Sequence, residues 1–220
     1  MRTYISPIGY DSRRVTRPVV NTGLGGDDEV RLVRPGDAGD TERATQAVAD
    51  VEQLLQEIEP KVEPTVERVS IASFETTVRE CCRILAGVPE ERDLIVSLGG
   101  GARDVLLPLT VGALVFASRI DQTLFYSDID GSVHEWTVPD LTARVPERAT
   151  DTFETILTVD DWVSLTEIAE ETGQSKSTVI RHVNDLEDVG IIETEMSGKA
   201  KRVQVAFSGE LLWRTPDTGL

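Results

Sequence analysis

Apolar positions follow two alternating periods through residues 1–145 of the chain. Short runs rich in β-branched and aromatic residues predict strands at residues 2–8, 29–33, 66–72, 94–96 and 123–126. Between them, apolar residues at helical spacing predict helices at residues 12–20, 42–59, 74–86 and 105–117. Asp130-Gly131, followed by a further run at residues 133–138, predicts a hairpin. Strands that alternate with helices predict a doubly wound α/β fold, with a mostly parallel sheet and an antiparallel edge.

The pattern changes after Pro146, where we place the boundary between domains 1–145 and 146–220. Helices are predicted at residues 150–159, 165–171 and 176–189, and strands at residues 191–194 and 203–206. Ser164 and Ser175 can cap the second and third helices, and Gly173 permits a tight turn between them. Helix, helix, turn, helix and two strands predict a winged helix-turn-helix domain.

A run of three glycines joins the strand at residues 94–96 to the helix that follows it. Glycines at such a junction let the backbone turn sharply and bring its N–H groups close to a ligand. The helix N-terminus attracts anions, and the planar guanidinium of Arg103 suits phosphate. The G-x-G-x-x-G spacing and the G-K-[ST] ending are both absent, so neither a dinucleotide fingerprint nor a P-loop is predicted. The alternative is a tight turn that binds nothing.

A second glycine loop follows the first strand. In doubly wound sheets, ligands bind at the carboxyl ends of the strands where the strand order reverses, and both loops are suited to that place. Each combines glycine with small or aromatic neighbours and nearby arginines. The candidate ligand-binding residues are therefore Ile8, Gly9, Tyr10, Asp11, Arg14, Gly99, Gly100, Gly101, Ala102 and Arg103.

The chain is strongly acidic, with 39 Asp and Glu against 22 Lys and Arg and a formal net charge of −17. Such a charge ordinarily argues against nucleic-acid binding. The acids are spread over every amphipathic segment, and only four basic residues are lysines. This composition favours a halophilic protein that works in high intracellular salt, where screening is strong. An ordinary acidic protein is the alternative.

Basic and small polar residues nevertheless gather on the predicted third helix and wing of the second domain. Three of the four lysines lie there, which favours DNA binding over a winged helix that makes only protein contacts. At high salt, base readout by Ser177, Thr178 and Arg181, together with dimeric half-sites, should carry most of the affinity. For His182 the alternative is a surface residue without a contact. The candidate DNA-binding residues are Ser175, Lys176, Ser177, Thr178, Arg181, His182, Lys199, Lys201 and Arg202.

Several classes of protein are not indicated. Cys81 and Cys82 are adjacent and cannot join distant segments, and with His134 and His182 they offer no zinc-ligand spacing. No apolar run approaches the roughly 20 residues of a membrane span, and the first residues do not form a signal peptide. We expect a cytoplasmic protein without metal or cofactor.

The order of these features resembles a known family. A Gly-Tyr-Asp loop after the first strand, Gly-Gly-Gly-Ala-Arg after the fourth and a C-terminal winged helix together resemble the archaeal CRISPR-associated transcription regulators of the CARF–winged-helix type, associated with type I-A systems. The resemblance implies a Rossmann-like sensor domain that forms a homodimer. It also implies that cyclic oligoadenylate, typically cyclic tetra-adenylate, binds across the two-fold axis.

The function implied by the resemblance is that of a ligand-responsive transcription regulator of CRISPR-associated genes, which binds promoter DNA as a double strand. The glycine loops and Tyr10 suit the phosphates and bases of such a ligand. No histidine or lysine lies near either loop, so we do not expect an enzyme. Two alternatives stay open: a ring nuclease that cleaves its cyclic ligand and uses the winged helix for dimerisation, and a winged-helix regulator that senses another nucleotide.

Overall fold

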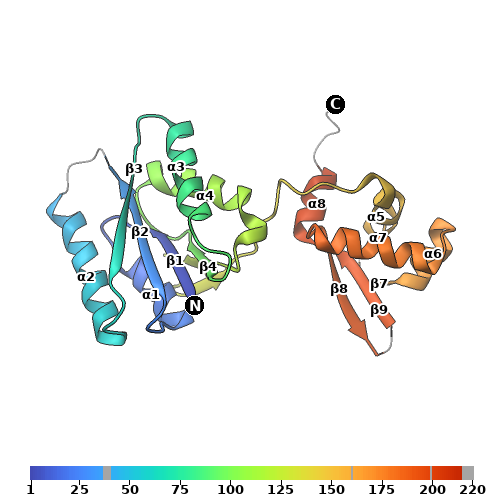
Figure 1. Ribbon diagram of the computed structural model, residues 1–220, viewed down its shortest axis with the longest axis horizontal. Helices are drawn as coiled ribbons and strands as arrows, with labels where there is room; N and C mark the ends of the chain where they lie inside the picture. The colour runs from blue at the N-terminus through green and yellow to red at the C-terminus, as the bar shows by residue number, and fades with distance from the viewer. Residues whose placement is uncertain (37–40, 160, 199, 215–220) are drawn as a thin grey trace. The chain divides into compact units, whose positions relative to one another are not determined.

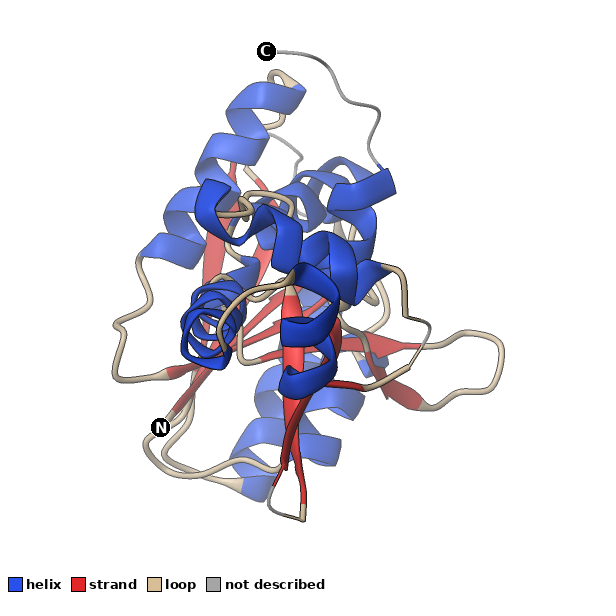
Figure 2. Ribbon diagram, turned by 90° about the vertical axis from the view of Figure 1, so that its right-hand side faces the viewer, coloured by secondary structure: helices blue, strands red, loops and turns tan. Residues whose placement is uncertain are grey.

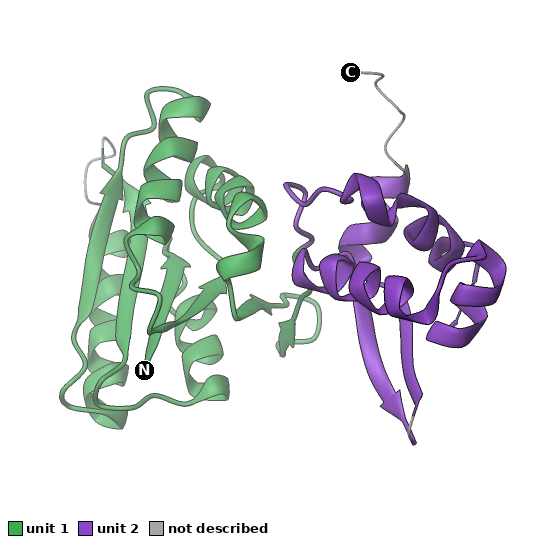
Figure 3. Cartoon of the chain, turned by 45° about the vertical axis from the view of Figure 1, so that its right-hand side comes forward, with its two compact units in different colours: residues 1–138 green, residues 139–220 purple. Residues whose placement is uncertain are grey.

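The computed structural model describes residues 1–36, 41–159, 161–198 and 200–214 in two compact units, Met1–Val138 and Pro139–Leu220 (Figure 3). The division falls before the boundary predicted at Pro146, because residues 139–145 pack with the second unit. Ala143 is buried in the core of that unit. The backbone N–H of Asp140 donates to Ser208 Oγ at 3.0 Å.

The first unit alternates strands and helices along its length, as predicted. Its elements are β1 (Arg2–Pro7), α1 (Arg13–Thr22), β2 (Glu29–Pro35), α2 (Glu42–Ile58), β3 (Pro64–Val69), α3 (Phe74–Ala86), β4 (Asp93–Ser97), α4 (Arg103–Val115), η1 (Ala117–Arg119), β5 (Gln122–Tyr126) and β6 (Val133–Glu135) (Figure 1).

The six strands form one sheet in the order β3-β2-β1-β4-β5-β6, and β6 alone runs antiparallel to its neighbour. The predicted mostly parallel Rossmann-like sheet with an antiparallel edge is therefore confirmed. Side chains alternate between its two faces: Tyr4 packs with α1 and α2, and its neighbour Ile5 packs with α3 and α4. The strand order reverses between β1 and β4, so the loops that follow these two strands begin at neighbouring strand ends.

The second unit is a winged helix, also as predicted. It comprises η2 (Glu147–Ala149), α5 (Thr150–Leu157), β7 (Val163–Ser164), α6 (Leu165–Thr172), α7 (Lys176–Asp188), β8 (Ile192–Ser197), β9 (Ala200–Val205) and α8 (Phe207–Arg214). The sequence analysis missed β7 and α8. β7 is two residues long, too short to show a period, and it pairs with β9 in a sheet of order β7-β9-β8. The hairpin of β8 and β9 extends away from the helices of this unit (Figures 1 and 2).

Local hydrogen bonds fix the helix-turn-helix. Ser164 and Glu167 form a reciprocal capping box at the start of α6. Gly173 ends α6 in the left-handed conformation at φ 67°, where a side chain would be strained. Ser175 Oγ then accepts from the backbone N–H of Thr178 at 3.2 Å and caps α7. The turn therefore presents α7 in one defined orientation against the core of its own unit.

Candidate functional site

The loops after β1 and β4 meet at the strand-order reversal and line a hollow of about 630 Å³ in the first unit. Gly9 approaches the second loop so closely that a Cβ there would lie 3.4 Å from the Cα of Gly101. All of the predicted ligand-binding residues line this one hollow, which we call the switch-point pocket: Ile8, Gly9, Tyr10, Asp11, Arg14, Gly99, Gly100, Gly101, Ala102 and Arg103.

Close packing requires the three consecutive glycines. A Cβ on Gly99 would lie 2.6 Å from the backbone nitrogen of Tyr126, and one on Gly100 would lie 2.8 Å from Cβ of Arg14. Gly101 adopts a φ of 85°, and its Cβ would lie 2.6 Å from Cβ of Pro7. The glycines therefore let the loop pass between β1, β5 and α1, and its backbone reaches the pocket because no side chains intervene.

The N-terminus of α4 opens into this pocket without a side-chain cap. Ala102 occupies the N-cap position and has no side-chain oxygen, although its backbone carbonyl accepts from the N–H groups of Val105 and Leu106 at 2.9 and 2.8 Å. By contrast, α2 and α3 have the caps Thr41 and Ser73. The N–H groups of Arg103 and Asp104, with the positive end of the α4 dipole, therefore receive no side-chain cap and can bind an anionic group. Arg103, exposed in the same turn, adds a cation.

Arg14 of α1 joins the loop after β4 to the turn between β5 and β6. Its Nη1 donates to the carbonyl oxygen of Gly99 at 2.6 Å, and its Nη2 donates to Oδ2 of Asp128 at 2.6 Å. Asp11 accepts two hydrogen bonds from the guanidinium of Arg13, both at 2.9 Å. These bonds lower the pKa of Asp11, so the carboxylate stays ionised and paired.

Further residues line the pocket that the sequence analysis did not identify: Arg34, Pro35, Thr41, Ala44, Ile71, Asp104, Leu106 and Asp128. Arg34 is only 8% exposed although it is charged. Arg34 lies at the end of β2, which pairs with β1. Its place in the pocket could have been predicted only if the strand order had been known. Asp128 gave no signal in the sequence, because it comes from the β5–β6 turn, far along the chain from Arg14.

Tyr10 supplies an aromatic surface at the pocket. The side chain is 60% exposed, and the guanidinium carbon of Arg43 on α2 lies 5.1 Å from its ring centroid. A cation at this distance interacts favourably with the ring face. The pair forms a planar platform of the kind on which nucleobases stack.

In the second unit, α7 carries the predicted polar face. Ser175, Lys176, Ser177 and Arg181 are exposed, and Thr178 is half-buried. The face also includes Ile180, which is 42% exposed, and Asn184. The sequence analysis missed both, although they continue the spacing of Ser177 along the helix. No acidic residue occurs at residues 175–184.

The prediction that His182 contacts DNA is wrong in this structure. His182 is only 4% exposed, and its Nδ1 forms a 2.9 Å hydrogen bond with Oγ1 of Thr152 on α5. Burial lowers the pKa of His182, which favours the neutral ring. The residue lies three positions after Val179 and one before Val183, on the inward face of α7. Helical spacing, and not the polarity of the ring, therefore determines that His182 is buried.

Two cations of the wing are bonded to groups of other elements in the second unit. Lys201 Nζ forms a 2.7 Å ion pair with Oε2 of Glu187 on α7. Arg202 donates through Nη2 to the carbonyl oxygen of Trp162. Glu187 is remote from the wing in sequence, so this pairing depends on tertiary packing. Lys199 lies outside the described residues.

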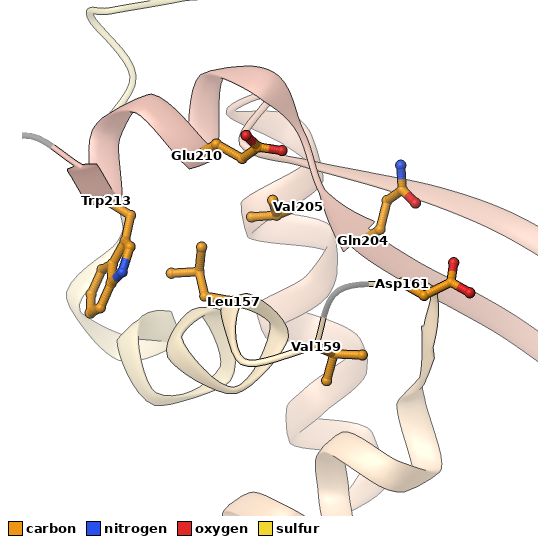
Figure 4. Close-up of a pocket in the computed structure, with 7 residues that line it drawn as sticks. All are labelled: Leu157, Val159, Asp161, Gln204, Val205, Glu210 and Trp213. Atoms are coloured by element: carbon orange, nitrogen blue, oxygen red, sulfur yellow. The ribbon is translucent and has the colours of Figure 1, made fainter.

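A second hollow, of about 280 Å³, lies within the second unit (Figure 4). Leu157, Val159 and Val205 give it apolar walls, and Trp213 of α8 lies at one side. Asp161 and Glu210 place carboxylates around it, which suits a polyanion poorly.

The described residues contain no group of three or more His, Cys, Asp or Glu that could hold a metal ion. None of the described helices combines the length and apolarity needed to cross a membrane.

The fold and pocket define the class: a Rossmann-like domain with a pocket at its switch point, followed by a winged helix-turn-helix. The chain belongs to the family of the Csa3 CRISPR-associated Rossmann-like domain, whose model matches residues 2–136. Residues 145–203 match the MarR family, so the winged helix is of the MarR type. No curated protein matches the chain significantly.

The chain is similar to solved structures at low sequence identity. Csm6 from Enterococcus italicus, bound to cyclic hexa-2'-fluoro-hexa-dAMP, matches with a TM-score of 0.54 and 10% identity over 87% of this chain and 55% of that chain. Protein VC1899 from Vibrio cholerae matches with a TM-score of 0.45 and 10% identity over 96% of this chain and 63% of that chain. The chain thus spans 55% and 63% of the lengths of these proteins.

Proposed function

We propose that the chain is a ligand-responsive transcription regulator of CRISPR-associated genes. A homodimer binds cyclic oligoadenylate, with cyclic tetra-adenylate as the candidate, between its two sensor domains. The winged helices bind double-stranded promoter DNA. The observation that carries the proposal is the convergence of both glycine loops, the uncapped start of α4 and the Tyr10 platform on one pocket. These features suit phosphates and bases in the same ligand.

An uncharged face of α4 supports the homodimer. Residues 105–115 contain no charged side chain, although 28% of the whole chain is charged. Leu107 is 57% exposed and Val115 is 47% exposed, and Val111 and Leu114 between them are only partly buried. Arg103 and Leu106 of this helix line the pocket. A second copy packed on this face would bring two pockets together, which suits a ligand with two-fold symmetry.

A Csm6 structure of the same fold contains a cyclic oligonucleotide, which supports the class of ligand proposed. The pocket favours a sensor over a ring nuclease, because the described residues that line it include neither histidine nor lysine as acid or base. The acid-rich composition supports a halophilic source, and the archaeal source and type I-A association are proposed on the family resemblance. A DNA partner would place the protein in the cytoplasm.

Calorimetry with the full chain in molar potassium chloride tests the proposal. We expect cyclic tetra-adenylate to bind with one ligand per two chains and to change the affinity for promoter DNA in a gel shift. Arg103→Ala should weaken the ligand by about tenfold, since hydrogen bonds to charged groups contribute 1.5–3 kcal/mol and this side chain is exposed. Arg79→Ala, which removes an exposed arginine outside the pocket, is the matched control.

Other outcomes would decide between the alternatives. Linear product in single-turnover incubations would favour the ring nuclease. Binding of a different nucleotide, with no heat from cyclic oligoadenylates of any size, would favour the regulator of other specificity. Equal ligand affinity in the Arg103→Ala variant and the wild type would remove Arg103 from the site.

A further inference from the structure

Arg14 and Asp128 form an ion pair within the switch-point pocket. Nη2 of Arg14 lies 2.6 Å from Oδ2 of Asp128, and Nη1 of the same guanidinium is held by the carbonyl oxygen of Gly99. Both side chains line the pocket, and they are 31% and 61% exposed. The arm of Arg14 that faces a carboxylate is therefore also accessible to an anion from solvent.

The carboxylate is presented by an ordered turn. The backbone N–H of Ser127 donates to the carbonyl of Ser132 at 2.9 Å, and the N–H of Gly131 donates to the carbonyl of Ser127 at 3.0 Å. Ser127 Oγ also accepts from the N–H of Ile129 at 3.2 Å. Because the turn is closed on both sides of Asp128, its backbone is held in one conformation from which the carboxylate reaches Arg14.

Asp11, a second carboxylate near Arg14, is paired with Arg13. Asp11 forms its short bonds with Arg13 and lies 3.9 Å from Nε of Arg14. Asp128 is thus the short ionic partner of Arg14 in the described pocket. An anionic ligand group that takes the same N–H of Nη2 displaces this carboxylate, and one that takes the second N–H lies beside it and is repelled by its charge.

We propose that Asp128 competes with the anionic groups of the ligand for Arg14 and thereby sets the affinity threshold of the pocket. The proposal rests on the proposed function for the identity of the ligand. It assigns a specificity role to Asp128: the pocket rejects anions that satisfy Arg14 alone and accepts those that also use the glycine loops and the α4 N-terminus. A small free anion should bind weakly, and a phosphate within a larger ligand should bind well.

The test compares Asp128→Asn with the wild type, using cyclic tetra-adenylate and inorganic pyrophosphate as probes for calorimetry on the full chain. Asp128→Asn keeps the side-chain shape and removes the charge. We expect affinity for both probes to rise by about threefold to tenfold, because an exposed ion pair contributes up to roughly 1 kcal/mol and a nearby like charge is also removed. Asp104→Asn is the matched control. It removes the same charge from the same pocket and, within the described part of the chain, forms no ion pair with Arg14. About twofold or less is expected there.

A double-mutant cycle shows whether the effect acts through Arg14. In an Arg14→Ala background, Asp128→Asn should change affinity no more than Asp104→Asn does. The proposal is overturned if Asp128→Asn weakens binding, if it matches Asp104→Asn in the wild-type background, or if its gain persists without Arg14.

The two probes separate this proposal from the proposed function. A gain for pyrophosphate, with no binding of cyclic tetra-adenylate by any variant, would support the competition and contradict the ligand. Equal binding of cyclic tetra-adenylate by the wild type and Asp128→Asn would support the ligand and contradict the competition. No binding of either probe by either protein would contradict both.

Discussion

The switch-point pocket and the exposed face of α7 are both proposed to receive polyanions, yet they arrange charge in opposite ways. In the pocket, Arg14 and Asp128 compensate each other, and further arginines and carboxylates occur together on its lining. On α7, Lys176 and Arg181 lie in a stretch of ten positions, 175–184, without a carboxylate. One surface is electrically balanced and the other is locally basic in a chain of net charge −17.

This difference indicates two modes of recognition. A balanced pocket attracts anions weakly at long range, so its selectivity must come from fitted donors: glycine-loop N–H groups, a helix N-terminus and one guanidinium arm. A basic helix face attracts phosphate backbones generally, and its selectivity must come from the side chains that reach base edges. We therefore expect shape to govern ligand binding at the pocket, and local charge to govern DNA binding at α7.

The largest effect should come from α4. Leu107→Asp places a charge in the proposed dimer face, once from each copy, and should weaken dimerisation by about 4 kcal/mol or more. Light scattering at graded concentrations should then show a monomer, and cyclic tetra-adenylate should no longer bind with one ligand per two chains. Ile58→Asp, at an exposed apolar position on α2, is the control and should leave the dimer intact. A dimer that survives Leu107→Asp would exclude α4 from the interface.

The next largest effect should be a loss of stability on substitution in the glycine loop after β4, residues 99–101. Gly101→Ala combines a φ of 85° with a Cβ placed 2.6 Å from Pro7, and it should lower the free energy of unfolding by about 2–4 kcal/mol. Gly173→Ala in the second unit meets the same backbone strain with nothing within 4 Å, so about 1–2 kcal/mol is expected. Urea denaturation of the full chain measures both. Equal losses would show that the glycine loop is strained but not tightly packed.

Much of the pocket could be predicted from the sequence, because its two main loops each follow an apolar strand directly. Gly9-Tyr10-Asp11 and the glycine run each lie within a few residues of their strand, so short segments of sequence are enough to place them. Arg34 and Asp128 depend on which strands become neighbours, and the order β3-β2-β1-β4-β5-β6 is not encoded in any single segment. The ten candidate residues that line the pocket could thus be predicted from the sequence, and Asp128, the ionic partner of Arg14, could not.

In the second unit, the sequence suggested roles for polar residues that the structure does not support. His182 could have been placed correctly, because it shares the inward helical face of Val179 and Val183, but its polarity suggested a surface role. The ion pair between Lys201 and Glu187 joins the wing to α7 and depends on tertiary packing. A cluster of cations in a sequence therefore overstates the charge available to DNA when acids from another element neutralise it.

That neutralisation predicts unequal roles for two cations. Arg181→Ala should weaken binding to a selected DNA duplex by about tenfold to a hundredfold, as expected for loss of a base contact. Lys201→Ala should cost only about threefold, because Glu187 already shares its charge, and the loss should be similar for all sequences. Glu187→Gln should raise affinity for unrelated duplexes by a comparable factor. Fluorescence anisotropy at several salt concentrations measures all three, and equal losses for Arg181→Ala and Lys201→Ala would contradict the distinction.

The smallest effect concerns the apolar side chain on the same face. Ile180 is 42% exposed, and Ser177 and Asn184 lie one helical turn before and after it. A branched aliphatic group there suits contact with the 5-methyl group of thymine in the major groove. Ile180→Ala should lower affinity for selected duplexes by about twofold to fivefold, because contact with one thymine methyl buries about one methylene equivalent of the side chain, which contributes about 0.8 kcal/mol.

Replacing thymine with uracil in those duplexes removes the methyl group from the DNA and leaves base pairing intact. At the contacted position, wild-type protein should lose about as much affinity as Ile180→Ala does, and the Ile180→Ala variant should lose nothing further. Ile180→Val, which retains a branched methyl pair, should fall between them. If uracil weakens the wild type and the alanine variant equally at every position, then Ile180 reads no thymine, and selectivity on this surface comes from its polar side chains alone.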